Sequence, residues 1–406
     1  MPDFLTIDDF NFKDKTALIR VDFNSPIDPE TKKIIDDTRI RVHGETIREL
    51  AENGAKVVVL AHQGRPGDPD FIPLRQHAEL LGEVLDKPVK YVDDVFGEKA
   101  QEAMKKLKRG EILVLDNVRS FANETAKGTP QEHAKQELVR KLAPLADVFV
   151  NDAFAAAHRA HVSMVGFTAV LPSVAGRVME RELQALKKVL EKPEKPCVFI
   201  MGGAKADDSL EISRYVLTNN IADHVLTGGV IGHVFLVARG FNLGEPNMKF
   251  LEKKGQMGLV PGIRELMKRY PKEIEMPADV AVEVDGKRRE MAVAEFPTSH
   301  PIYDIGTETT KKYREIIGEA KSIVLSGPMG VFENREFMKG TRKIFTAVAA
   351  SKAFSLIGGG HTVAAVEELG LAEKMSYIST AGGALIEFLM GKQLPGVAAL
   401  EKAVKP

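Results

Sequence analysis

The sequence repeats one pattern: a short run of apolar and β-branched residues, a polar or glycine-rich break, and then a segment with helical spacing. Most of these runs are apolar throughout, so they are expected to be strands buried on both faces. Such strands, separated by helices, are typical of parallel sheets covered by helices on both sides. The runs lie at 17–23, 56–61, 111–115, 147–150, 197–201, 224–227, 322–325 and 354–357. Both halves of the chain are therefore predicted to be α/β layers.

The first run breaks the apolar pattern. Arg20, Asp22 and Asn24 alternate with apolar residues there, and Pro26 closes the segment. Moving a charge out of water costs several kcal/mol per ion unless a partner or a ligand compensates. These polar groups are therefore predicted to have ligands or buried partners.

Length, charge and cysteine content limit the class of protein. A chain of 406 residues favours two or three domains. The formal net charge is −1, so no overall attraction to nucleic acid or to a membrane is expected. Cys197 is the only cysteine, and no export signal or apolar stretch of about 18 residues is found. These features predict a soluble cytoplasmic protein without nucleic-acid or membrane partners.

A helical stripe near the middle of the chain is followed by a turn with two prolines, Pro193 and Pro196. The stripe consists of Met179, Leu183, Leu186 and Leu190. From the residues alone, a sheet-covering helix and a connector between two domains are about equally supported. The mid-chain position and the charged turn favour the connector.

The residues after each predicted strand differ between the two halves. In parallel sheets ligands bind beyond the carboxyl ends of the strands, so these residues indicate the chemistry. The first half has polar and basic residues there, namely Asp22, Asn24, His62, Arg65, Asn117, Arg119, His158, Arg159 and His161. The second half has glycine-rich segments, namely GGAK at 202–205, TGG at 227–229, SGPMG at 326–330 and GGGHT at 358–362.

These two sets of residues suit two different anions. Several guanidinium groups fit a small polyanion, whereas glycine loops before helices bring backbone N–H groups close to nucleotide phosphates. A single arginine usually makes a surface ion pair, and a single glycine pair is usually a turn. Recurrence at four strand ends in each half favours ligand sites, although neither standard nucleotide fingerprint occurs. Two unlike anion sites on facing domains suggest phosphoryl transfer.

Seven motifs resemble those of phosphoglycerate kinases in order and spacing. They are RVDFNSP, AHQGRP, VNDAFAAAHRAH, MGGAK, SGPMGVFE, GGGHT and STAGGALIEFLMGKQLPGV. The resemblance implies an α/β fold of two doubly wound parallel-sheet domains that face across a cleft and are joined by a hinge helix. Residues 1–176 would bind phosphoglycerate, 177–196 would connect the domains, 197–390 would bind nucleotide, and the tail 391–406 would return to the first domain. The implied activity is reversible transfer of the acyl phosphate of 1,3-bisphosphoglycerate to ADP.

The resemblance also implies roles for individual residues. Arg39 and Lys205, with Gly359 and Gly382, would act on the transferred phosphoryl group. The phosphoglycerate ligands would be Asp22, Asn24, Arg39, His62, Arg65, Arg119 and Arg159. The nucleotide contacts would be Gly202, Gly203, Lys205, Gly228, Gly306, Pro328, Glu333, Gly358, Gly359, Gly360, His361 and Thr362.

Three positions depart from the pattern of many family members. Ser209 replaces a second lysine, His361 replaces an aspartate associated with the magnesium nucleotide, and Ser326 replaces an asparagine. An archaeal-type branch of the family is similar at these positions. Imidazole is a poor ligand for Mg²⁺, so Asp207 and above all Asp208 are the nearest replacement carboxylates. Activity is expected to survive, with Mg²⁺ entering as the metal complex of ADP or ATP.

Two other classes of protein remain open at this point. One is a non-catalytic two-domain protein that closes on a phosphorylated sugar or acid, and the lack of an export signal and the presence of Lys205 argue against it. The other is a regulatory or scaffold protein that kept the fold but lost turnover, which Ser209 and His361 make conceivable.

Overall fold

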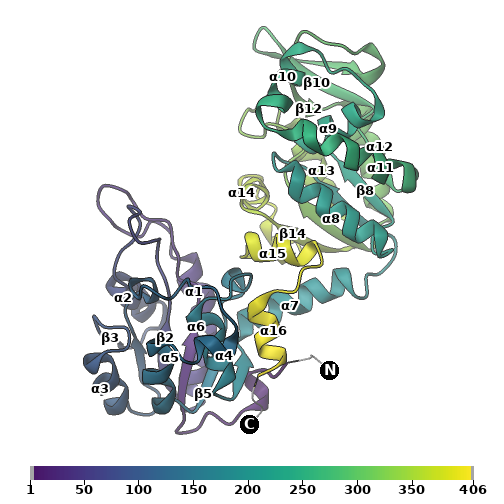
Figure 1. Ribbon diagram of the computed structural model, residues 1–406. Helices are drawn as coiled ribbons and strands as arrows, with labels where there is room; N and C mark the ends of the chain where they lie inside the picture. Colours follow the sequence, from purple (N-terminus) through teal and green to yellow (C-terminus); the bar gives the residue numbers. More distant parts are fainter. Residues whose placement is uncertain (1–3, 404–406) are drawn as a thin grey trace. The chain divides into compact units, whose positions relative to one another are not determined.

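The computed structural model describes residues 4–403, and the chain divides into two compact units (Figure 1). The first unit contains the chain up to Leu183 together with the chain from Gln393 onward, and the second contains Gln184–Lys392. The boundary falls inside helix α7 (Arg177–Leu190), which lies in the segment predicted to connect two domains. Residues 1–3 and 404–406 of the predicted ranges lie outside the described residues.

The first unit is built on a six-stranded parallel sheet of order β3-β4-β2-β1-β5-β6. Its strands are β1 (Thr16–Arg20), β2 (Lys56–Leu60), β3 (Val89–Tyr91), β4 (Ile112–Val114), β5 (Val148–Asn151) and β6 (Ser173–Ala175). Its helices are α1 (Thr38–Glu52), α2 (Arg75–Leu85), α3 (Glu98–Lys106), α4 (Pro130–His133), α5 (Glu137–Leu142), α6 (Val162–Val165) and α16 (Pro395–Glu401). The strand order reverses between β1 and β5, so ligands are expected at the carboxyl ends of these two strands.

Apolar side chains cover both faces of this sheet. Ala17 and Ile19 of β1 belong to a cluster with residues of α1 and α2, whereas Leu18 belongs to a second cluster with residues of α3 and α5. The first strand ends at Arg20, three residues earlier than the predicted run. Asp22 and Asn24 therefore stand in the loop that follows the strand.

The carboxyl-terminal segment belongs to the first unit. Figure 1 shows helix α16 in yellow beside α6, and the two helices are in contact. The backbone N–H of Gly396 donates to the carbonyl of Ala157 at 2.8 Å.

The second unit is built on another six-stranded parallel sheet, of order β15-β14-β13-β7-β8-β9. Its strands are β7 (Cys197–Met201), β8 (His224–Thr227), β9 (Ile274–Glu275), β13 (Ser322–Ser326), β14 (Phe354–Gly358) and β15 (Tyr377–Ile378). Its helices are α8 (Ala206–Thr218), α9 (Gly229–Arg239), α10 (Glu245–Lys253), α11 (Val260–Arg269), α12 (Thr307–Glu319), α13 (Lys339–Ala350), α14 (Gly360–Glu368) and α15 (Gly383–Leu389). The order reverses between β7 and β13, as in dinucleotide-binding sheets, so a ligand is expected beyond these strands.

A small antiparallel sheet, β11-β10-β12, extends the second unit. It consists of β10 (Asp279–Val284), β11 (Lys287–Ala292) and β12 (Ile302–Ile305). Asp285 and Gly286 form the two-residue turn between β10 and β11, both with positive φ, as a type I′ turn requires. Among the described residues, no helix is long and apolar enough to cross a membrane.

Candidate active site

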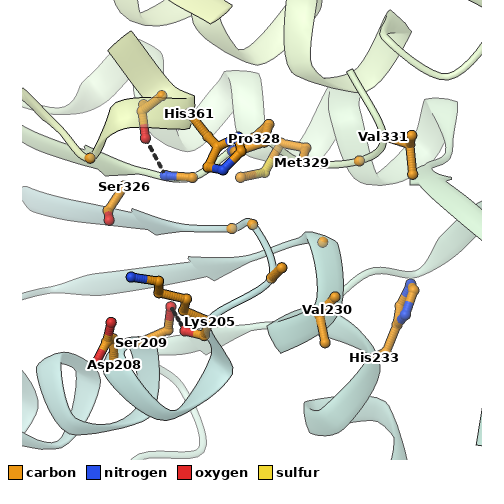
Figure 2. A pocket seen from close by; sticks show the side chains of 18 of the residues that line it. Lys205, Asp208, Ser209, Val230, His233, Ser326, Pro328, Met329, Val331 and His361 are labelled. Carbon is orange, nitrogen blue, oxygen red and sulfur yellow. Dashed lines mark hydrogen bonds between the residues drawn. The ribbon is translucent and has the colours of Figure 1, made fainter. Parts of the chain in front are cut away.

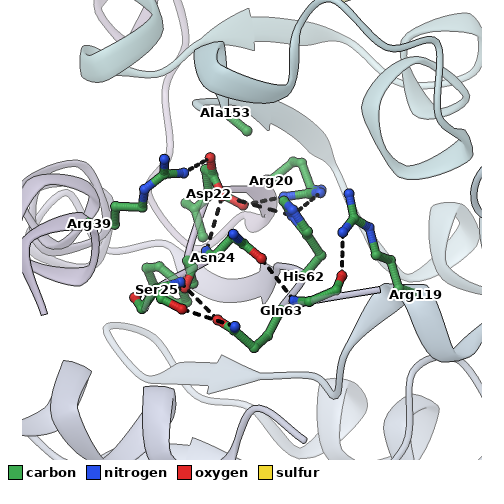
Figure 3. A network of polar contacts seen from close by, with 12 residues as sticks. Arg20, Asp22, Asn24, Ser25, Arg39, His62, Gln63, Arg119 and Ala153 are labelled. Carbon is green, nitrogen blue, oxygen red and sulfur yellow. Dashed lines mark hydrogen bonds and ion pairs between the residues drawn. The ribbon is translucent and has the colours of Figure 1, made fainter. Parts of the chain in front are cut away.

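In the first unit, polar side chains gather beyond the carboxyl ends of β1 and β2 (Figure 3). Asp22 forms an ion pair with Arg39 of α1 and accepts a hydrogen bond from the backbone N–H of Asn24 at 3.0 Å. Burial raises the pKa of Asp22, but Arg39 and His62 outweigh burial and hold it below its ordinary value. Asp22 is therefore an ionised carboxylate that fixes the position of Arg39.

Arg20 is the buried charge that the first run predicted to need a partner, and its side chain is 1% exposed. Its Nε donates to Ser163 Oγ at 2.9 Å and its Nη2 lies 3.1 Å from His62 Nδ1. Because a guanidinium can only donate, Nδ1 of His62 must be the acceptor, and the ring proton is on Nε2. Burial, the largest cause, and the nearby arginines lower the pKa of His62 well below its usual range. His62 is therefore a neutral imidazole with its tautomer fixed by Arg20.

Further arginines make the first site strongly positive. Arg119 is 7% exposed and donates to the carbonyl of Gly64. Its pKa is lowered to about 10, first by burial and then by repulsion from Arg159, Arg20 and Arg65. Guanidinium groups that repel one another at a partly buried site are stabilised by an anion with several negative oxygens.

Glu124, which the sequence analysis did not select, lies behind this arginine cluster. Its carboxylate is 1% exposed and accepts hydrogen bonds from Ser163 Oγ at 2.5 Å and Ser163 N at 3.0 Å. Burial raises the pKa of Glu124 to about 7, against the opposing effect of Arg20. Ser163 thus links the carboxylate of Glu124 to the guanidinium of Arg20.

In the second unit, a cavity of about 900 Å³ lies beyond the carboxyl ends of β7 and β13 (Figure 2). It is lined by residues of the loops after these strands and by the amino-terminal turns of α8, α9, α14 and α15. Predicted site residues that line it are Gly202, Gly203, Lys205, Asp208, Pro328, Glu333, Gly359, Gly360, His361, Thr362 and Gly382.

Three glycine-containing loops are joined by backbone hydrogen bonds beneath this cavity. Gly202 N donates to Ser326 O at 2.8 Å, Gly203 N to Pro328 O at 2.7 Å, and Gly229 N to Met329 O at 2.8 Å. Gly327 has φ +94°, and a Cβ there would approach the Gly202 carbonyl to 2.3 Å. Only glycine fits this position, because both the backbone conformation and the space exclude a side chain.

The two ends of the cavity offer different groups to a ligand. At the end with Lys205, the first backbone N–H groups of α14, those of Gly360 and His361, have no protein acceptor within residues 4–403. At the start of α9, in contrast, Gly228 N donates to Met201 O at 2.9 Å and Val230 N to Gly203 O at 2.9 Å. Free N–H groups at a helix start beside a lysine suit phosphate, so the end with Lys205 is the end better suited to an anion.

Three of the predicted nucleotide residues do not line the cavity. Gly228 packs against Met329, Gly358 packs against Leu385, and Gly306 lies at the start of α12 against the carboxylate of Asp279. Ser209, in the place of the second family lysine, lines the cavity, and its hydroxyl donates to Lys205 O at 3.2 Å. Residues that line it but were not selected from the sequence include His233, Phe250, Tyr303, Glu387 and Lys392.

Comparisons with known proteins agree with one another. The family model of phosphoglycerate kinase matches residues 7–392. The phosphoglycerate kinases of Methanothermobacter thermautotrophicus and Methanobacterium bryantii are 49% and 50% identical, covering 99% and 97% of this chain and 98% and 96% of their own lengths. The solved structures of the Pyrococcus horikoshii and Coxiella burnetii phosphoglycerate kinases are similar to this chain, with TM-scores of 0.87 and 0.85 and identities of 42% and 33%. Each alignment with these two structures covers 98% of both chains.

Proposed function

The chain belongs to the phosphoglycerate kinase family, whose members reversibly transfer the acyl phosphate of 1,3-bisphosphoglycerate to ADP, and we propose which of its residues bind each of the two substrates. The arginine cluster of the first unit binds the phosphoglycerate, and the glycine-lined cavity of the second binds ADP or ATP. The observation that supports this division is that Arg65, Arg119 and Arg159 lie close enough to repel one another beside the buried Arg20, and Asp22 offsets this repulsion only in part. The direct phosphoglycerate ligands are Asp22, Asn24, Arg39, His62, Arg65, Arg119 and Arg159.

The proposed mechanism is a direct in-line transfer without a phosphoenzyme. In the direction of ATP formation no general base is needed, because the attacking and leaving oxygens can both be anionic already. The work of the protein is electrostatic: Arg39, Lys205 and the backbone N–H groups near Gly359 and Gly382 offset charge on the transferred phosphoryl group. Nε2–H of His62, oriented through Arg20, donates a hydrogen bond to the phosphoglycerate.

We propose that Mg²⁺ enters as its nucleotide complex and that Asp208 is its protein ligand. The carboxylate of Asp208 lines the cavity near Lys205. Among the described residues, no three His, Cys, Asp or Glu side chains are grouped to hold a metal by themselves. One carboxylate together with nucleotide phosphates and water is a usual set of ligands for Mg²⁺, whereas the imidazole of His361 suits a phosphate oxygen better. When bound, the ion supplies positive charge to the phosphates.

The experiment that tests the function is an assay of ATP formation from 1,3-bisphosphoglycerate and ADP, with and without Mg²⁺. We expect ATP only when both substrates and the metal are present. Tight binding of ADP without transfer would instead identify a non-catalytic protein with this fold. We also propose that the enzyme acts in the cytoplasm with small molecules as its partners, which its single buried cysteine and nearly balanced charge support.

Arg65 provides a test of the division between the two sites. Its side chain is exposed and belongs to the arginine cluster of the first unit. Arg65→Ala is expected to raise the KM for 1,3-bisphosphoglycerate about tenfold or more, because a charge-assisted hydrogen bond contributes roughly 1.5–3 kcal/mol. The KM for ADP should change less than twofold. Steady-state kinetics with each substrate varied in turn measures both values, and equal losses for the two substrates would contradict the division.

Asp208 and Asp207 form a matched pair for the metal. Both lie in the first turn of α8, but Asp208 lines the cavity whereas Asp207 is exposed and does not. Asp208→Asn is expected to raise the Mg²⁺ concentration needed for half-maximal activity about tenfold, because a metal carboxylate is lost. Asp207→Asn should leave it unchanged. Titration of both variants with Mg²⁺ at a fixed ADP concentration measures this value. An equal rise in the half-maximal Mg²⁺ concentration in both variants would reject Asp208 as the ligand.

A further inference from the structure

The end of the cavity away from Lys205 is largely apolar (Figure 2). Val230 and His233 come from α9, Phe250 comes from α10, and Val331 follows β13. Phe250 and Val331 are 41% and 39% exposed, and only four large apolar side chains between residues 4 and 403 stand out as exposed. Exposed apolar side chains inside a concave site suit a flat apolar ligand group.

This end of the cavity is also unsuited to phosphate. The first N–H groups of α9 are already donated to the carbonyls of Met201, Met329 and Gly203. A helix start whose N–H groups are used in this way has none to offer to an anion. With the phosphates at the end with Lys205, the nucleotide base is left to the end with His233.

Among residues 4–403, the imidazole of His233 has no hydrogen-bond or ion-pair partner. Burial alone lowers its pKa to about 4, with no contribution from a charged group or a hydrogen bond in the described structure. Asn247, which also lines the cavity, is occupied: its Nδ2 donates to Leu243 O at 2.9 Å and His300 O at 3.0 Å. His233 is therefore a neutral imidazole with one donor and one acceptor, and the protein fixes neither tautomer.

We propose that the imidazole of His233 forms a hydrogen bond with the group at the six-position of the purine base. Its tautomer changes with the base that is bound. This inference rests on the proposed nucleotide site. With adenine, the bare ring nitrogen accepts a hydrogen bond from the 6-amino group. With a 6-oxo purine such as hypoxanthine, the ring N–H donates to the 6-oxygen. His233 thereby allows both kinds of purine nucleoside diphosphate to be used with similar efficiency.

The test compares ADP with inosine diphosphate, which carries an oxygen in place of the 6-amino group and, as a consequence, a proton on N1. For the unmodified enzyme we expect values of kcat/KM for the two nucleotides within about fivefold of each other, because either tautomer supplies one hydrogen bond. His233→Leu removes both the donor and the acceptor, so it should raise the KM for both nucleotides about three- to tenfold with kcat nearly unchanged. His233→Gln, whose amide offers a donor or an acceptor, should retain use of both.

His224→Leu is the matched control, because His224 lies at the start of β8 and does not line the cavity. Unchanged KM values in His233→Leu, or a rise for only one of the two nucleotides, would overturn the proposal. The proposal would also be overturned if His233→Leu lost only the preference for ADP over 2′-deoxy-ADP, because His233 would then contact the ribose. Calorimetry measures the affinities of the unmodified enzyme and of each variant for ADP and inosine diphosphate without turnover. A loss of catalysis can therefore be distinguished from a loss of the hydrogen bond between His233 and the base.

Discussion

Arg39→Ala is expected to lower kcat by at least about a hundredfold while the protein remains folded. Arg39 is the guanidinium that Asp22 holds in place, and 34% of its side chain is exposed at the first site. A positive group that offsets charge on a phosphoryl group in transfer is worth roughly 10³ to 10⁵ in rate. Single-turnover kinetics with bound 1,3-bisphosphoglycerate and ADP measures the chemical step directly.

The fold should tolerate this change because Asp22 keeps other partners. The N–H of Asn24 still donates to its carboxylate, and His62 and Arg20 still lie nearby. Arg41→Ala is the matched control: Arg41 lies on the same helix, is paired with Asp37 and is not in contact with Asp22. Near-normal kcat in Arg39→Ala, or an equal loss in Arg41→Ala, would reject the role proposed for Arg39.

The fold was predictable from the sequence where strands are buried on both faces. The predicted runs at 197–201 and 224–227 coincide with β7 and β8, because these strands are buried between helix layers and most of their residues are apolar. No strand was predicted at β3, β6, β9 or β15, which are two or three residues long and form the edges of the two sheets. Two or three residues are too few to show a recognisable pattern of apolar residues, and these strands form because they pair with a neighbouring strand.

The grouping of Arg65 with Arg119 was predictable, because the same residue type recurs at the ends of neighbouring strands. Arg20 was seen to need a partner but was not assigned one, because that partner, Ser163, is 143 residues away. Glu124 had no signal at all, since a glutamate in a polar loop is normally solvated and only the tertiary fold buries it. His233 resembles an ordinary residue of an apolar helix in the sequence, and only the tertiary structure shows that it lines the cavity.

Gly327→Ala is expected to damage the second unit alone. The added Cβ would approach the carbon and oxygen of the Gly202 carbonyl to 2.3 Å, and the residue would have to keep φ +94°. Because the obstacle is backbone, the loops after β7 and β13 must separate. Overpacking costs about 1–3 kcal/mol and the left-handed conformation roughly 1–2 kcal/mol more. We therefore expect a large fall in the thermal unfolding temperature of this unit and at least a tenfold weakening of ADP binding.

Differential scanning calorimetry together with titration of each substrate separates local from global damage. Binding of 3-phosphoglycerate should persist in Gly327→Ala, because the arginine cluster belongs to the first unit. Gly318→Ala is the matched control, since Gly318 lies in α12 without positive φ and a Cβ there meets nothing within 4 Å. That control should be as stable as the unmodified protein or slightly more so, because alanine favours helix. If Gly327→Ala bound ADP normally, the close packing of the three loops would not be what forms the nucleotide site.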